Sequence, residues 1–174
     1  MNDPRYPIGK FTPDPEPTPE LRARHIDEIA ALPGHMREAV RGLSAEQLET
    51  PYRDGGWTLK QVVHHVPESH MNAYIRFKLA LTENCPTIKP YDEAAWARLK
   101  DVELTPIDIS LNLLESIHSR WVTLLNTMKE DDFARKLNHP ESGVQTLDRM
   151  VALYDWHGNH HLAHITGTRE RMKW

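Results

Sequence analysis

Apolar residues recur at helical spacing in four long stretches of the chain. In a helix, side chains three or four positions apart share a face, so this spacing places an apolar stripe against a core. No stretch shows the apolar and polar alternation that is typical of a half-buried strand. The predicted helices run from about residue 19 to 42, 59 to 81, 107 to 128, and from about 146 through 165. The pattern therefore predicts an all-α protein.

The connections between these helices predict a bundle with one long crossover. Residues 52–57 form a glycine-containing loop before the second helix, and residues 138–143 form a loop or small hairpin before the fourth. Pro33-Gly34 predicts a kink or a short break in the first helix. Residues 83–106 form a much longer connection, with room for a short helix over residues 92–100. Because a crossover of this length lets consecutive helices run parallel, we expect a four-helix bundle with the crossover between its second and third helices.

The length of the chain predicts a single domain over residues 1–174, since a chain of this size buries a core without disulfides. Its first nineteen residues, 1–19, contain six of the thirteen prolines. Proline removes a backbone donor and is excluded from helix interiors and central strands. This segment is therefore predicted to be an extended arm on the surface of the bundle.

The composition excludes several classes of protein. A net charge of -4 offers no basic excess for binding nucleic acid or an anionic membrane. No apolar run has the length of a membrane span, and the N-terminus lacks the apolar core of a signal peptide. The single cysteine, Cys85, excludes an intrachain disulfide and a thiolate metal site. We therefore predict a cytoplasmic protein that binds neither nucleic acid nor membranes.

Histidine is the compositional outlier, with eleven residues. Four of them fall in the eight residues from His157 to His164. Histidine is the usual nitrogen ligand for zinc, nickel and copper, and one helix can supply two ligands at positions i and i+4. Both His157/His161 and His160/His164 have this spacing, and all four lie within about 100° of arc on a helical wheel. Helical geometry alone therefore leaves the choice of pair open.

A second histidine cluster, His64, His65 and His70, lies on the second predicted helix. His70 falls in the apolar face and is better explained as a buried, hydrogen-bonded core residue. His65 lies at the margin of that face and His64 points further away, so the periodicity favours His65 as a metal ligand. The zinc-protease pattern H-E-x-x-H is absent from both C-terminal pairs, which argues against that class.

A series of short segments outside these clusters and around them carries a resemblance to a known family. They are Tyr6–Gly9, Pro51–Thr58, Gln61–His65, Ser69–Asn72, Tyr74–Lys78, Lys89–Asp92 and Trp156–His164. These segments resemble the YfiT branch of the DinB-like superfamily over nearly the whole chain. The resemblance implies a four-helix bundle with a long second crossover, a homodimer, and one divalent metal per chain held by three histidines. Members of that branch are assigned as metal-dependent hydrolases, and relatives in the wider superfamily transfer low-molecular-weight thiols such as bacillithiol.

Carried over position by position, the resemblance implies that His65, His160 and His164 hold the metal. The other two histidines of the C-terminal run then become neighbours that shape the pocket. Nitrogen ligands suit zinc and also nickel, so either metal is expected. Pro67 departs from the family pattern, and we expect it to kink the second helix while leaving His65 at the metal.

Further candidates surround this predicted site. Glu68 and Asp155 are weak candidates for a general base. The candidates for substrate contacts or for orienting the ligands are Trp57, Asn72, Arg76 and His161.

Three neutral imidazoles leave the full charge of a divalent ion to act on its remaining ligands. Such an ion lowers the pKa of bound water to about 7, so our first hypothesis is a hydrolase that activates water on a three-histidine site and acts on a small molecule. The same ion could instead ionise a thiol, which makes a thiol S-transferase with a low-molecular-weight thiol partner the alternative. A non-catalytic, metal-binding dimer is the third hypothesis.

Overall fold

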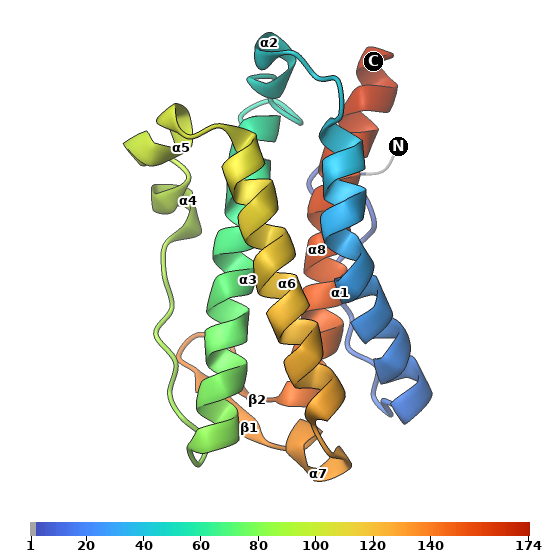
Figure 1. Ribbon diagram of the computed structural model, residues 1–174, viewed down its shortest axis with the longest axis vertical. Helices are drawn as coiled ribbons and strands as arrows, with labels where there is room; N and C mark the ends of the chain where they lie inside the picture. The colour runs from blue at the N-terminus through green and yellow to red at the C-terminus, as the bar shows by residue number, and fades with distance from the viewer. Residues whose placement is uncertain (1–2) are drawn as a thin grey trace.

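A computed structural model describes residues 3–174 of the chain. Its body consists of four long helices, α1 (Pro19–Val40), α3 (Leu59–Thr82), α6 (Ile107–Thr127) and α8 (Leu147–Met172). Both α1 and α3 pack against α6 and α8, so the four helices form a bundle (Figure 1). The predicted fold class is confirmed. Within the described residues, no helix is long and apolar enough to cross a membrane.

The helices do not simply alternate in direction. In Figure 1, α1 and α8 run one way along the bundle, and α3 and α6 run the other way. The segment between α3 and α6 makes this possible, because it returns the chain along the length of the bundle before α6 begins. It carries two short helices, α4 (Glu93–Trp96) and α5 (Lys100–Leu104). The predicted crossover is thus confirmed.

The remaining elements are short and lie at the two ends of the bundle (Figure 1). They are α2 (Ala45–Leu48), α7 (Glu130–Phe133), β1 (Lys136–His139) and β2 (Gly143–Thr146). The two strands pair antiparallel as a hairpin, with Lys136 opposite Thr146. Of the loop or small hairpin predicted over residues 138–143, the structure shows the hairpin. Its strands did not stand out in the apolar pattern, because each has only four residues.

Threonines cap three of the four long helices. The hydroxyl oxygens of Thr18, Thr58 and Thr146 each accept a hydrogen bond from the backbone N–H three residues further on. These bonds satisfy donors that the first turn of a helix leaves unpaired.

Two prolines lie inside helices without interrupting them. Pro33 is buried in α1 and Pro67 is buried in α3, and both helices are continuous across these positions. Of the kink or short break predicted at Pro33-Gly34, the break is therefore wrong, and the kinks expected at Pro33 and Pro67 stay predictions. Each proline lacks the N–H that would bond to the carbonyl four residues earlier, which for Pro33 is the carbonyl of Ile29.

The described part of the segment before α1, residues 3–18, contacts α8. The indole N–H of Trp156 donates to the backbone oxygen of Gly9 at 3.2 Å, and the ring of Phe11 packs on the same indole. The arm therefore packs against α8 at Trp156.

A layer of histidines divides the interior of the bundle. One apolar cluster includes Phe77 and Trp121, and a second includes Val62 and Leu114. Along α3, α6 and α8, buried histidines fall between the residues of the two clusters. They are His70, His118, His160, His161 and His164, with the half-buried His157 beside them. Polar chemistry therefore lies at mid-height in the bundle.

Candidate metal centre

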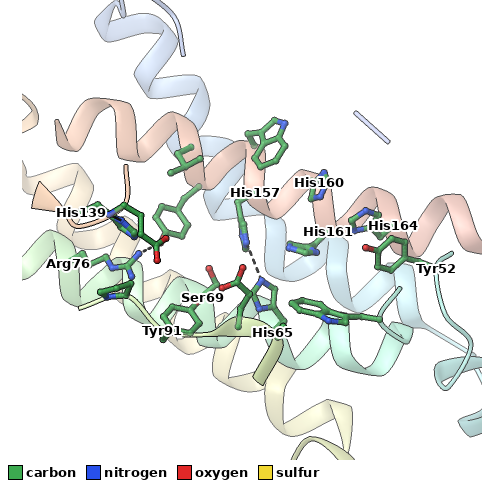
Figure 2. Close-up of a pocket in the computed structure, with 18 residues that line it drawn as sticks. Tyr52, His65, Ser69, Arg76, Tyr91, His139, His157, His160, His161 and His164 are labelled. Carbon is green, nitrogen blue, oxygen red and sulfur yellow. Dashed lines mark hydrogen bonds between the residues drawn. The ribbon is translucent and has the colours of Figure 1, made fainter. Parts of the chain in front are cut away.

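Three imidazoles from two helices converge in this layer. His65 comes from α3, and His157 and His161 come from successive turns of α8. One ring nitrogen of each lies within 4.8 Å of the others, and residues 3–174 contain no other such group of three or more His, Cys, Asp or Glu side chains. The Nε2 atoms of His65 and His157 are 3.3 Å apart (Figure 2). The three side chains form a candidate metal centre.

The geometry and charge state of the three rings fit a divalent ion. Metal–nitrogen bonds of about 2.0–2.1 Å at a tetrahedral angle place two ligand nitrogens about 3.3 Å apart, which matches the two Nε2 atoms. Burial disfavours the charged form, so it lowers the pKa of His65 to about 4 and the pKa values of His157 and His161 well below the usual value. At neutral pH the rings are uncharged, as metal ligands must be.

A chain of buried imidazoles orients His157 from behind. The Nδ1 atom of His118 lies 2.5 Å from the carbonyl oxygen of Ile29, and this oxygen can only accept. Burial lowers the pKa of His118 to about 4 and that of His70 well below the usual value, so both rings are neutral and each carries one hydrogen. His118 therefore donates from Nδ1 to Ile29 and accepts at Nε2.

The remaining links follow from this starting point. His70 Nδ1 lies 2.8 Å from His118 Nε2 and must donate to it, so His70 Nε2 is an acceptor. His157 Nδ1, 3.1 Å from His70 Nε2, must then carry the hydrogen of its own ring. This leaves a lone pair on the Nε2 of His157, the atom that faces His65. The tautomer needed for metal binding is thus set by hydrogen bonds behind the ligand.

A cavity of about 520 Å³ opens beside the centre. Figure 2 shows the candidate ligands near its middle, with Arg76 and Tyr91 at one end and His164 and Tyr52 at the other. This volume falls in the range of sites for small molecules.

Known proteins show where this chain belongs. The model of the DinB superfamily matches residues 11–165. The chain is a member of the DinB superfamily. Relatives from Bacillus cereus (strain 03BB102) and Bacillus thuringiensis subsp. konkukian (strain 97-27) are each 55% identical over 174 residues, which is 100% of both chains, and each is named "Putative metal-dependent hydrolase".

A solved structure extends the similarity to three dimensions. YfiT from Bacillus subtilis has a TM-score of 0.96 and 46% identity to this chain, with 98% of each chain covered. It is described as "a probable metal-dependent hydrolase with an unusual four-helix bundle topology". The predicted resemblance to the superfamily and to its YfiT branch is confirmed.

In this DinB superfamily member, two predicted ligands lie beside the candidate centre. His160 stacks on Trp156 with ring centroids 4.6 Å apart, and His164 stacks on Tyr52 with centroids 3.9 Å apart. Neither joins His65 in the group of converging nitrogens. The two i, i+4 pairs of α8 point about 60° apart, and the second pair turns toward the arm and the loop before α3. The geometry therefore favours the other pair over the predicted one.

The predicted substrate contacts divide into two groups. Trp57, Arg76 and His161 line the cavity, and the indole of Trp57 meets the ring of His65 edge-on at 4.8 Å between centroids. Asn72 does not line the cavity, and its amide donates to the backbone of its own helix.

Neither predicted general base lies at the cavity. Glu68 is absent from its lining, and burial raises the pKa of this carboxyl. Asp155 points to the α1 side of α8, where it pairs with His25 and accepts from Asn159. The carboxylates that do line the cavity belong to Glu93 and Glu141.

Sequence reasoning missed His118, although a signal was present. This residue follows Leu114 by four positions and precedes Trp121 by three, so it lies on the apolar face of α6. A histidine at such a position needs a buried partner. The prediction that His70 is a buried, hydrogen-bonded core residue is confirmed.

Proposed function

We propose that the chain is a metal-dependent hydrolase of small molecules, with one divalent ion held by His65, His157 and His161. This set differs from the one that the resemblance implies, because His157 and His161 take the place of His160 and His164. The observation that carries the proposal is the convergence of three neutral imidazoles, two buried and one half-buried, beside a cavity, in a chain that matches metal-dependent hydrolase relatives over its whole length.

The chain's own residues would perform three tasks. The three imidazoles hold the ion, and the chain through His70 and His118 keeps the lone pair of His157 directed at it. Trp57 packs over the rings of His65 and His161 and shields them from solvent on that side. A bound divalent ion would act as a Lewis acid and lower the pKa of a water molecule that it binds. Zinc and nickel both suit three nitrogen ligands.

Metal analysis of single variants tests the ligand set. We expect His65→Ala, His157→Ala and His161→Ala to lose stoichiometric metal, because each removes one of three ligands. His160→Ala and His164→Ala are matched controls from the same helix and are expected to retain it. Metal content is measured by inductively coupled plasma mass spectrometry after gel filtration. Metal loss confined to the two control variants would refute this set.

An activity assay separates the hydrolase from the other two hypotheses. The metal-loaded protein is incubated with aryl esters, with and without a low-molecular-weight thiol. We expect release of the alcohol without any thiol. Product formed only with thiol would establish the S-transferase, and no product under either condition would favour the non-catalytic metal-binding dimer. The homodimer itself stays a prediction, which light scattering tests.

A further inference from the structure

One end of the cavity contains a buried arginine without an acidic partner. Arg76 is 9% exposed, and within residues 3–174 no carboxylate pairs with it within 4.0 Å. Its Nη1 donates to the hydroxyl of Tyr154 at 3.2 Å, and its guanidinium lies 6.0 Å from the ring centre of Tyr91. Neither contact neutralises the charge. A buried charge without a counter-charge is costly, so this arrangement indicates a partner supplied by a ligand.

Another buried arginine of the same chain shows the contrast. Arg22 is 4% exposed and lies between two carboxylates, with Glu130 at 2.7 Å and Asp148 at 3.7 Å. The charge of this buried guanidinium is therefore paired within the protein. Arg76 differs because it faces a cavity.

Arg76 lies on the same face of α3 as the candidate centre. It follows His65 by eleven residues, which is three turns or about 16 Å along the helix axis. Helical side chains lean toward the N-terminus, so the guanidinium reaches back toward His65. Figure 2 shows Arg76 at one end of the cavity, with the histidines further along. A small molecule can therefore contact both.

Other groups at this end of the cavity define the charge that it accepts. His139 Nδ1 accepts from the backbone N–H of Glu141 at 3.2 Å, so a neutral His139 carries its hydrogen on Nε2 and can donate. Glu93 and Glu141 also line the cavity, but both are exposed. One unpaired guanidinium near two exposed carboxylates suits a monoanionic carboxylate better than a phosphate dianion, because like charges repel.

We propose that Arg76 forms an anion subsite, and that the substrate is a small molecule with a carboxylate at one end and the bond to be cleaved at the other. This inference rests on the proposed hydrolase function. Arginine binds carboxylates through two parallel N–H···O bonds, and the contact with Tyr154 holds the guanidinium in place while leaving Nη2 and Nε free.

Binding of matched ligands tests the subsite without any need for turnover. Phenylacetate and phenylacetamide have nearly the same shape and differ in charge. Phenyl phosphate is included to compare a phosphate group with the carboxylate. Dissociation constants are measured by calorimetry on metal-loaded wild type, Arg76→Gln and Arg76→Lys. Arg120→Gln is the matched control, because Arg120 is exposed on α6 and also lies over a tyrosine ring, at 5.9 Å from Tyr74.

We expect wild type and Arg120→Gln to bind phenylacetate about 10- to 100-fold tighter than phenylacetamide, as charge-assisted hydrogen bonds allow. In Arg76→Gln we expect only the part of the preference for phenylacetate that comes from its contact with the metal. Arg76→Lys is expected to keep part of the preference that Arg76 provides, because lysine retains the positive charge. An equal preference in wild type and Arg76→Gln would overturn the proposal, and tighter binding of phenyl phosphate would overturn the choice of carboxylate.

Two further results keep the test decisive. Circular dichroism shows whether Arg76→Gln folds. If it does not, nuclear Overhauser effects between phenylacetate and the Tyr154 ring are measured in wild type to locate the ligand, and their absence refutes the subsite. If the carboxylate preference depends on Arg76 but no ester is hydrolysed, the subsite stands and the hydrolase function fails. Hydrolysis without that preference would support the hydrolase function and refute the subsite.

Discussion

Replacing His70 tests whether the buried imidazole chain prepares His157 for the metal. His70→Leu removes the acceptor of the Nδ1–H of His157. A metal-bound His157 must keep its hydrogen on Nδ1, so this N–H would be buried without a partner. The metal-free protein escapes the penalty by moving the hydrogen to Nε2, so the cost falls on the bound state. A buried unpaired donor costs about 1–3 kcal/mol, which corresponds to about 5- to 150-fold in the dissociation constant.

His70→Gln is the matched control for this prediction. The glutamine amide oxygen occupies roughly the position of the imidazole Nε2 and can still accept from His157, whereas both variants lose the bond to His118. Zinc affinity is measured by competition with a chromophoric chelator, and folding by circular dichroism. We expect His70→Gln to bind within about threefold of wild type and His70→Leu at least about tenfold more weakly. Equal affinities in the two variants would refute the reasoning.

Three further predictions concern stability. The free energy of unfolding of the metal-free protein is expected to fall by about 3 kcal/mol between pH 6.5 and pH 4 through His118 alone. The reason is that the unfolded ring gains a proton below its pKa of 6.5, whereas the folded ring stays neutral until its pKa of about 4. Urea titrations at several pH values should show that this free energy depends less steeply on pH in His118→Asn. Chelation is expected to lower the midpoint of thermal unfolding, since an ion at a thousandfold its dissociation constant stabilises the folded state by about 4 kcal/mol, and an unchanged midpoint after metal removal would argue against a site formed only on folding. Gly158→Ala places a methyl group 2.3 Å from Leu32 Cδ2 and is expected to destabilise the chain by about 1–3 kcal/mol in urea unfolding. The double variant with Leu32→Ala is expected to lose less stability than the sum of the two single losses, because the truncated side chain no longer meets the methyl group.

Local signals in the sequence were enough to predict the long helices. The threonine caps at Thr18, Thr58 and Thr146 act on backbone groups within three residues, so their effect is visible without a tertiary structure. The hairpin of β1 and β2 was less accessible because pairing of four-residue strands depends on the surrounding fold. The break predicted at Pro33 failed because burial against neighbouring helices keeps α1 continuous.

The candidate centre was predictable only in part. His65 lies at the margin of an apolar face, which the sequence pattern detects, and the structure places it at the group of converging nitrogens. The apolar pattern could not predict which histidine pair of α8 faces His65, because this depends on how α8 is rotated about its axis relative to α3. That rotation depends on distant contacts, among them the close approach of Gly158 to Leu32 and the bond from Trp156 to the arm. No helical wheel contains these contacts.

The orientation of His157 depends on all four helices of the bundle. Pro33 provides no N–H to the carbonyl of Ile29 in α1, so this oxygen is available to His118 of α6. From there the hydrogen bonds pass through His70 of α3 to His157 of α8. A proline that costs α1 a backbone hydrogen bond thus leaves a buried acceptor where the chain of imidazoles begins. Because each link needs the packing of a different helix, the metal-binding tautomer is defined only in the assembled bundle, and metal affinity should therefore report on the integrity of the whole fold.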